Sequence, residues 1–190
     1  MSNDIDQIVR TLWLAVFIIW AVAGISLKQT VGSRAEGRSR IAVWIVAVAW
    51  WLLFTRGFGR EPLSLPLFHV TLVTQYAGLL ITVLGLALAL WARWRIGRNW
   101  SPLIEMKEGH ELMQTGPYRI VRHPIYSGFM LATLGAAIVF GALAGFISVG
   151  LIVAAWGYKA HMEESAMLEQ FGQEYQNYKA KVKGLIPFVW

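Results

Sequence analysis

The sequence predicts an all-α, polytopic membrane protein with about five transmembrane helices. Hydrophobic residues make up 56% of the 190-residue chain and charged residues only 15%. Several apolar runs approach the roughly 20 residues that a helix needs to cross the ~30 Å hydrocarbon core of a bilayer. Several of the ten Trp residues lie near the ends of these runs, as in the aromatic belts of membrane proteins.

Two apolar runs in the N-terminal part of the chain predict the first two spans. They cover residues 8–27 and 41–55, and the loop between them carries four Lys or Arg residues. The second run is slightly short for a crossing, so we expect the bilayer to thin there or the helix to continue beyond the run. A loop with two prolines, residues 56–71, leads to the third predicted span at residues 72–94.

A helical hairpin is predicted for the last part of the membrane region. Residues 126–157 are mostly apolar, and this stretch is too long for one crossing but suits two tightly joined helices. Gly141 and Gly145 lie at its midpoint. Their spacing matches the small-residue pattern of paired membrane helices, but their position favours a turn.

The tail from Lys159 differs from the spans and predicts an amphipathic helix. Gly184 and Pro187 are expected to end this helix. Its apolar residues recur at three- and four-residue spacing, which places them on one helix face. They are Leu168, Phe171, Tyr175, Tyr178 and Val182.

The distribution of basic residues predicts which loops share a side of the membrane. Loop 28–40 has four Lys or Arg residues, segment 93–125 has six and the tail from residue 158 has four, against two in loop 56–71. With five spans, the three richer segments fall on one side, which the positive-inside rule places in the cytoplasm. We therefore expect the N-terminus outside, and the long loop and the C-terminus in the cytoplasm.

The composition also excludes several classes of function. The formal net charge is +6, but in so apolar a chain the basic loops are better explained by membrane topology and anionic lipid headgroups. We therefore predict membrane lipids as partners, and no nucleic acid. The chain has no cysteine, which excludes disulfides, thiolate metal sites and a Cys nucleophile. The sequence contains no GxGxxG or Walker-type motif, so it does not support a Rossmann or P-loop nucleotide site.

Residues 116–128 concentrate hydrogen-bonding side chains where a predicted span begins. Two X-Pro steps bias the residues before them away from helix, which makes the segment a shaped loop. Arg122, His123 and Tyr126 lie close together in it, and the free amides of the following helical turn attract anions. These groups suit a polar ligand at a membrane surface. The alternative is an interfacial anchor, since such residues are ordinary at membrane boundaries.

Glu163 and Glu164 follow the last predicted span at its cytoplasmic end. Glu164 continues the line of the apolar stripe and can point inward, where an acid needs a partner. The alternative is that both are solvated helix charges, with Lys159 as a weak partner four residues before Glu163. His161 and Glu164 have metal-compatible spacing, but no second His or Cys lies near them, so we predict no metal site.

Three motifs, taken together and in order, resemble the isoprenylcysteine carboxyl methyltransferase family. They are GRNWSP at 97–102, HELMQTGPYRIVRHPIYSG at 110–128 and EESAMLEQFGQEYQNYKAKV at 163–182. The resemblance covers roughly residues 94–187, and phospholipid N-methyltransferases are similar in this region. It implies several transmembrane helices, a helical hairpin, and a cytoplasmic S-adenosylmethionine site formed by the loop and the tail helix. The single membrane domain, 1–190, then comprises N-terminal spans (1–72) and a catalytic core (73–190).

The resemblance also implies a role for each matching residue. Leu103 falls at a cofactor-contacting position where relatives carry a polar residue. The arginine that contacts the substrate carboxylate falls at Lys159, which keeps the charge but lacks the bidentate fork. From residue type and position, Arg122 is expected to hold an anionic substrate, and Glu164 or His123 to act as a general base if the acceptor is an amine. The remaining cofactor-binding residues are His110, Leu112, Met113, Tyr118, His123, Pro124, Tyr126 and Glu163.

The implied function is methyl transfer from S-adenosylmethionine to a lipophilic acceptor that enters from the bilayer, with S-adenosylhomocysteine as the product. The acceptor group expected from the resemblance is the carboxylate of an isoprenylcysteine-like substrate. A phospholipid N-methyltransferase is the first alternative. A sterol-type reductase, for which the chain is short, and a non-catalytic membrane protein that kept the pocket are the others. We expect no obligate protein partner.

Overall fold

Helices dominate the protein, which confirms the predicted all-α class. The computed structural model describes residues 2–24, 30–33, 36–55, 61–97, 105–107 and 112–187. A 3-10 turn, η3 (Gly116–Arg119), precedes α4, and two short strands, β1 (Thr30–Ser33) and β2 (Glu105–Lys107), pair antiparallel. The helices are α1 (Ser2–Gly24), α2 (Glu36–Thr55), α3 (Leu72–Ile96), α4 (Pro124–Phe140) and α5 (Leu143–Lys181).

The length and surface of the helices suit a bilayer. Helices α1, α3 and α5 are long and apolar enough to cross a membrane, and the apolar parts of α2 and α4, Arg40–Thr55 and Pro124–Phe140, are shorter. Large apolar side chains are exposed along the bundle, such as Val73 at 78% and Trp44 at 71% exposure. Lipid tails are the environment in which such a surface is favourable.

The predicted hairpin is present, and Gly141 makes its turn. This residue caps α4 in the left-handed conformation, with φ 67° and ψ 3°, and α5 begins at Leu143. Glycine adopts this conformation without the steric cost that a Cβ brings. Gly145 lies inside α5, where an added Cβ would meet Ala137 of α4 at 3.1 Å. The first glycine therefore turns the chain, and the second allows the two helices to approach.

The closest helix pairing in the described residues joins α3 to α4 through small residues. A Cβ added to Gly85 would lie 2.4 Å from the Ala132 nitrogen and 2.5 Å from the Gly128 oxygen. A Cβ added to Gly135 would lie 2.5 Å from the Thr82 nitrogen. Small residues let membrane helices approach to backbone contact, where dispersion forces act over a large area. The two helices are thereby fixed relative to one another.

Aromatic side chains from four helices fill the centre of the bundle. Trp13 of α1 stacks on Phe129 of α4 with ring centroids 5.8 Å apart. Trp50 of α2 lies 5.4 Å from Phe129, and Trp156 of α5 lies 5.3 Å from it. Tyr126 continues the cluster toward one end of the bundle, 4.8 Å from Trp156. The same packing that holds the helices together therefore reaches the polar residues at that end.

The last span and the tail helix form one continuous element, which differs from the separate tail helix predicted. Helix α5 runs without interruption past Lys159, because no helix-breaking residue stands between the span and the tail. The break comes at Gly172, which has φ 50° and ψ −121°. This conformation is open to glycine and strained for other residues. The helix bends there and ends at Lys181, with Val182 as its cap.

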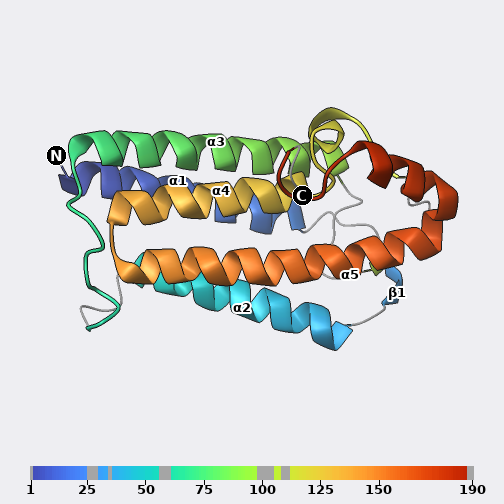
Figure 1. Ribbon diagram of the computed structural model, residues 1–190, viewed down its shortest axis with the longest axis horizontal. Helices are drawn as coiled ribbons and strands as arrows, with labels where there is room; N and C mark the ends of the chain where they lie inside the picture. Colours follow the sequence, from blue (N-terminus) through green and yellow to red (C-terminus); the bar gives the residue numbers. More distant parts are fainter. Residues whose placement is uncertain are drawn as a thin grey trace.

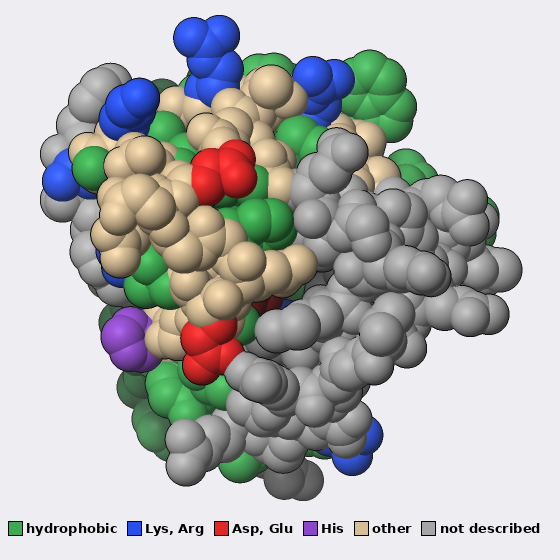
Figure 2. Space-filling view, turned by 90° about the vertical axis from the view of Figure 1, so that its right-hand side faces the viewer, with side chains coloured by type: hydrophobic (Ala, Val, Ile, Leu, Met, Phe, Trp, Pro, Cys, Tyr) green, Lys and Arg blue, Asp and Glu red, His purple; other side chains and the backbone are tan. Residues whose placement is uncertain are grey.

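The polar segments gather at one end of the bundle. In Figure 1, β1, η3, the start of α4 and the C-terminal part of α5 all lie at the right-hand end, and the N-terminus lies at the other. Figure 2 views that end directly, with Lys and Arg side chains around its edge and acidic side chains between them. The segments that the basic-residue count assigned to one side of the membrane therefore share one end of the molecule.

Candidate active site

The turn that carries Arg122 and His123 is held in place by the C-terminal segment of the chain. Pro124 begins α4, so His123 is the N-cap residue of that helix. The backbone N–H of Arg122 donates to the Lys183 oxygen at 2.8 Å, and that of His123 donates to the Gly184 oxygen at 3.0 Å. These two bonds satisfy backbone donors that the start of a helix leaves unpaired. They also fix the direction of both side chains toward α5.

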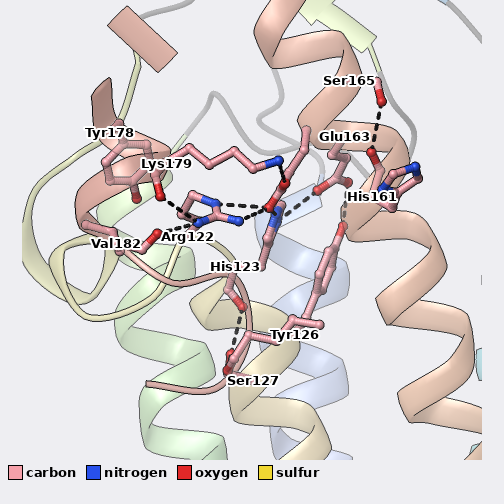
Figure 3. A network of polar contacts seen from close by, with 12 residues as sticks. Arg122, His123, Tyr126, Ser127, His161, Glu163, Ser165, Tyr178, Lys179 and Val182 are labelled. Carbon is pink, nitrogen blue, oxygen red and sulfur yellow. Dashed lines mark hydrogen bonds and ion pairs between the residues drawn. The ribbon is translucent and has the colours of Figure 1, made fainter. Parts of the chain in front are cut away.

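Glu163 faces this turn from α5 and is shared by three side chains. The Tyr126 hydroxyl donates to Glu163 Oε1 at 2.5 Å. His123 Nδ1 lies 3.4 Å from Glu163 Oε2, and Lys159 Nζ lies 3.7 Å from Oε1. Figure 3 shows the Tyr126 phenol and the His123 ring pointing to this carboxylate from below. Glu163 is thus a largely buried anion whose contacts are donors and cations.

Glu164, the next residue, is surrounded by cationic side chains. The Arg122 guanidinium donates to Glu164 Oε1 through Nη2 and also through Nε, the latter at 2.9 Å. Lys179 Nζ lies 2.7 Å from Oε2, and His123 Nε2 lies 3.4 Å from Oε1. Both oxygens of Glu164 are therefore engaged. A carboxylate held in this way stays ionised and is a poor proton acceptor.

His123 lies between the two carboxylates, with one ring nitrogen facing each. Burial alone lowers the pKa of His123, but the contacts with Glu163 and Glu164 outweigh burial and raise the pKa above its usual value. The imidazolium form is favoured because each N–H then faces an anion. His123 is therefore a cationic link between the two acids, and in this protonated form its ring cannot accept another proton.

The titration of His123 predicts a pH-dependent stability. A raised pKa in the folded protein means that the stabilisation is fully present below pH ~6.5 and is lost as the pH rises through the raised value. We expect the Tm in detergent to fall over that range in the wild type, and His123→Gln to flatten the profile. His161→Gln, at an exposed position on α5, is the matched control and should keep the wild-type profile. Equal profiles for wild type and His123→Gln would contradict this assignment.

Tyr118 and Lys159 are both buried beside these acids. The Tyr118 side chain is 7% exposed and Lys159 is 5% exposed. Burial first, and the nearby Glu163 second, raise the pKa of the Tyr118 phenol, so it stays neutral at physiological pH. Lys159 Nζ lies 5.6 Å from the centroid of the Tyr126 ring, within cation–π range. Such burial is costly for a lysine and marks the position as one with a specific use.

Some of the predicted site residues contact one another at this end of the bundle, and others lie beside them or outside the described part of the chain. Arg122, His123, Tyr126, Glu163, Glu164 and Lys159 converge in one network. Leu112 and Met113 are half-buried before η3, and Met113 packs against the core. Pro124 is fully buried at the start of α4. Leu103 and His110 lie outside the described residues.

The contacts between the end of the C-terminal segment and the site turn are not predicted by the sequence pattern. In the sequence, Lys179 is one of the four basic residues of the tail. The backbone oxygens of Val182, Lys183 and Gly184 accept hydrogen bonds that no sequence motif predicts. Arg122 donates to the Val182 oxygen, and Tyr178 donates its hydroxyl to the Tyr118 oxygen at 2.6 Å. Gly172 is the available signal, because an isolated glycine in an amphipathic helix marks a place where the chain can bend.

The fold and the network define a helical integral membrane protein with an enzyme-like site at one end of its bundle. The chain belongs to the phospholipid methyltransferase family, whose sequence model matches residues 73–174. This match covers the third helix, the site turn and α5 as far as the bend. The family assignment rests on the part of the chain that carries the network.

Individual relatives agree with the resemblance seen in the motifs. A probable protein-S-isoprenylcysteine O-methyltransferase of rice (Oryza sativa subsp. indica) is 29% identical over 134 residues, 68% of this chain and 69% of that protein. The human protein-S-isoprenylcysteine O-methyltransferase is 28% identical over 150 residues, 76% of this chain and 51% of the human one.

A solved structure is similar as well. It is that of the eukaryotic intramembrane Ras methyltransferase, an isoprenylcysteine carboxyl methyltransferase, and it matches with a TM-score of 0.54 at 26% identity. The match covers 82% of this chain and 54% of that chain. The chain therefore spans about half the length of the human protein and of the solved structure.

Proposed function

We propose that this membrane methyltransferase transfers a methyl group from S-adenosylmethionine to the carboxylate of an isoprenylcysteine-like acceptor. The names of the rice and human relatives and of the solved structure support this acceptor. The observation that carries the proposal is the arrangement around Glu163 and Glu164, which offers an anion and a buried cation to ligands but no free base.

The residues around Glu163 fit S-adenosylmethionine. The cofactor carries cationic groups, and Glu163 offers a partly buried carboxylate. The rings of His123 and Tyr126 lie nearly parallel, at an interplanar angle of 5°, beside that carboxylate. When bound, S-adenosylmethionine supplies a methyl group on a sulfonium. Glu163, Tyr126, His123 and Tyr118 bind and orient the cofactor, and the bundle below them excludes water.

Among the residues that the structure describes, the absence of a free base favours a carboxylate acceptor over an amine. A carboxylate is already ionised at neutral pH and attacks without losing a proton, whereas an ammonium group must first be deprotonated. The two candidate bases are Glu164 and His123. Glu164 is held by Arg122, His123 and Lys179, and both His123 nitrogens face carboxylates. Buried Lys159 supplies positive charge for the acceptor carboxylate.

The distribution of basic residues supports a membrane orientation. We assign the end of the bundle with the network, and with it the C-terminal segment, to the cytoplasm, because the basic residues concentrate there. The N-terminus then lies outside. A lipophilic acceptor reaches the site sideways from the bilayer, because the network borders the aromatic cluster of the membrane-spanning helices.

A product analysis tests the proposed reaction. Purified protein in lipid nanodiscs is incubated with methyl-labelled S-adenosylmethionine and with an S-prenylated cysteine that has a free carboxylate. The matched control is the same compound with its carboxylate amidated, and phosphatidylethanolamine is the competing acceptor. We expect a base-labile methyl ester on the free acid alone. Base-stable label on phosphatidylethanolamine would instead assign the protein to the N-methyltransferases. Failure to bind S-adenosylhomocysteine in a titration would contradict enzymatic function.

A further inference from the structure

Lys179 joins the far end of α5 to its middle. The bend at Gly172 turns the helix so that Lys179 Nζ comes within 2.7 Å of Glu164 Oε2. The Lys179 side chain is 44% exposed and that of Glu164 is 11% exposed. The ion pair therefore joins a partly exposed lysine to a largely buried carboxylate, and Figure 3 shows Lys179 reaching into the network.

The same segment makes a series of contacts with the turn that carries His123. We call residues 173–187 the C-terminal strap. Besides the backbone bonds from Arg122 and His123 to Lys183 and Gly184, the Ser127 hydroxyl lies 2.6 Å from the Leu185 oxygen. Leu185 itself is buried, at 3% exposure. The strap is thus docked along the start of α4.

Glu164 is the point at which these contacts converge. Arg122 connects it to the strap backbone through bonds to the Val182 and Lys179 oxygens, and Lys179 connects it through its side chain. Glu164 therefore ties α5, the turn and the strap together. Both of its oxygens are engaged by cationic side chains, so the charge of Glu164 is used in holding these elements together.

We propose that Lys179 is a positioning residue that, with Glu164 as its anchor, clamps the C-terminal strap onto the Arg122–His123 turn and thereby holds His123 against Glu163. The role in catalysis rests on the proposed function, because it matters only if Glu163 and His123 bind the cofactor. The clamp itself is a property of the fold. Arg122 and Glu164 then serve the same positioning role.

Loss of the clamp lowers the fraction of molecules whose site is assembled. The apparent affinity for a ligand falls in proportion to that fraction, while turnover by the assembled molecules is unchanged. A partly exposed ion pair has a modest effect. We therefore expect Lys179→Ala to raise the KM for S-adenosylmethionine about two- to fivefold with kcat changed less than about twofold. Lys179→Arg should restore the wild-type KM.

Strap release can be measured without activity, because the chain has no cysteine of its own. Leu185→Cys places a single thiol in the strap at a buried position, where maleimide reaches it only when the strap lifts. We expect Lys179→Ala in this background to increase the labelling rate about two- to fivefold. Lys181→Ala, which removes an exposed lysine two residues further along the chain, is the matched control and should leave the rate unchanged.

The outcomes separate the clamp from the proposed function. Faster labelling in Lys179→Ala, with rescue by arginine and a raised KM, supports the proposal. Equal labelling in Lys179→Ala and Lys181→Ala overturns it, and so does a loss of kcat at constant KM, which would place Lys179 at the reacting groups. Faster labelling in a protein that neither binds nor uses S-adenosylmethionine upholds the clamp and refutes the proposed function.

Discussion

Replacing Glu163 by Gln is expected to lower kcat/KM for methyl transfer about 100-fold. Gln keeps the shape of the side chain but removes the charge that faces Tyr126, His123 and Lys159. Hydrogen bonds to a charged group contribute roughly 1.5–3 kcal/mol each. The variant loses this contribution, because it lacks the anion that the proposed cofactor contact requires. The affinity for S-adenosylhomocysteine should fall in parallel, which calorimetric titration measures directly.

The control for this change lies on the same helix. Glu169 is exposed on α5, so Glu169→Gln removes the same charge from the same element away from the network. It should retain wild-type kinetics and cofactor affinity. If Glu163→Gln binds S-adenosylhomocysteine as tightly as Glu169→Gln, Glu163 is not a cofactor ligand. A large drop in Tm for Glu163→Gln alone would assign it a structural role.

Replacing Gly85 by Ala is expected to destabilise the protein by about 3 kcal/mol, the upper part of the range for overpacking. The new Cβ would lie within 2.5 Å of backbone atoms of Gly128 and Ala132, and backbone atoms cannot move aside as a flexible side chain can. Helices α3 and α4 must therefore separate. Since α4 begins at the site turn, activity should fall along with the Tm measured by circular dichroism in detergent.

Gly150 provides the matched control for the packing prediction. It lies in α5, is exposed, and has nothing within 4 Å of an added Cβ among the described residues. Gly150→Ala should therefore leave the Tm unchanged or raise it slightly, because Ala favours helix over Gly. Equal Tm values for the two variants would show that α3 and α4 can separate without a loss of folding stability.

The sequence by itself determined the helical class, the hairpin and the identity of the central site residues. Apolar length and helical periodicity are local properties, so they survive in any arrangement of the helices. The turn at Gly141 followed from the length of residues 126–157. The motif around His123 and the acidic pair at 163–164 identified two segments of the network, and the structure brings them together.

The tertiary structure alone decided how these parts are used. Whether Glu164 is a free base or a held anion depends on Arg122, which approaches it from the turn before α4, and on Lys179, which approaches it because α5 bends at Gly172. The backbone contacts of Gly85 depend on which face of α3 meets α4. No local pattern encodes either fact, because each arises between groups far apart in sequence whose distance is set by the packing of the whole bundle.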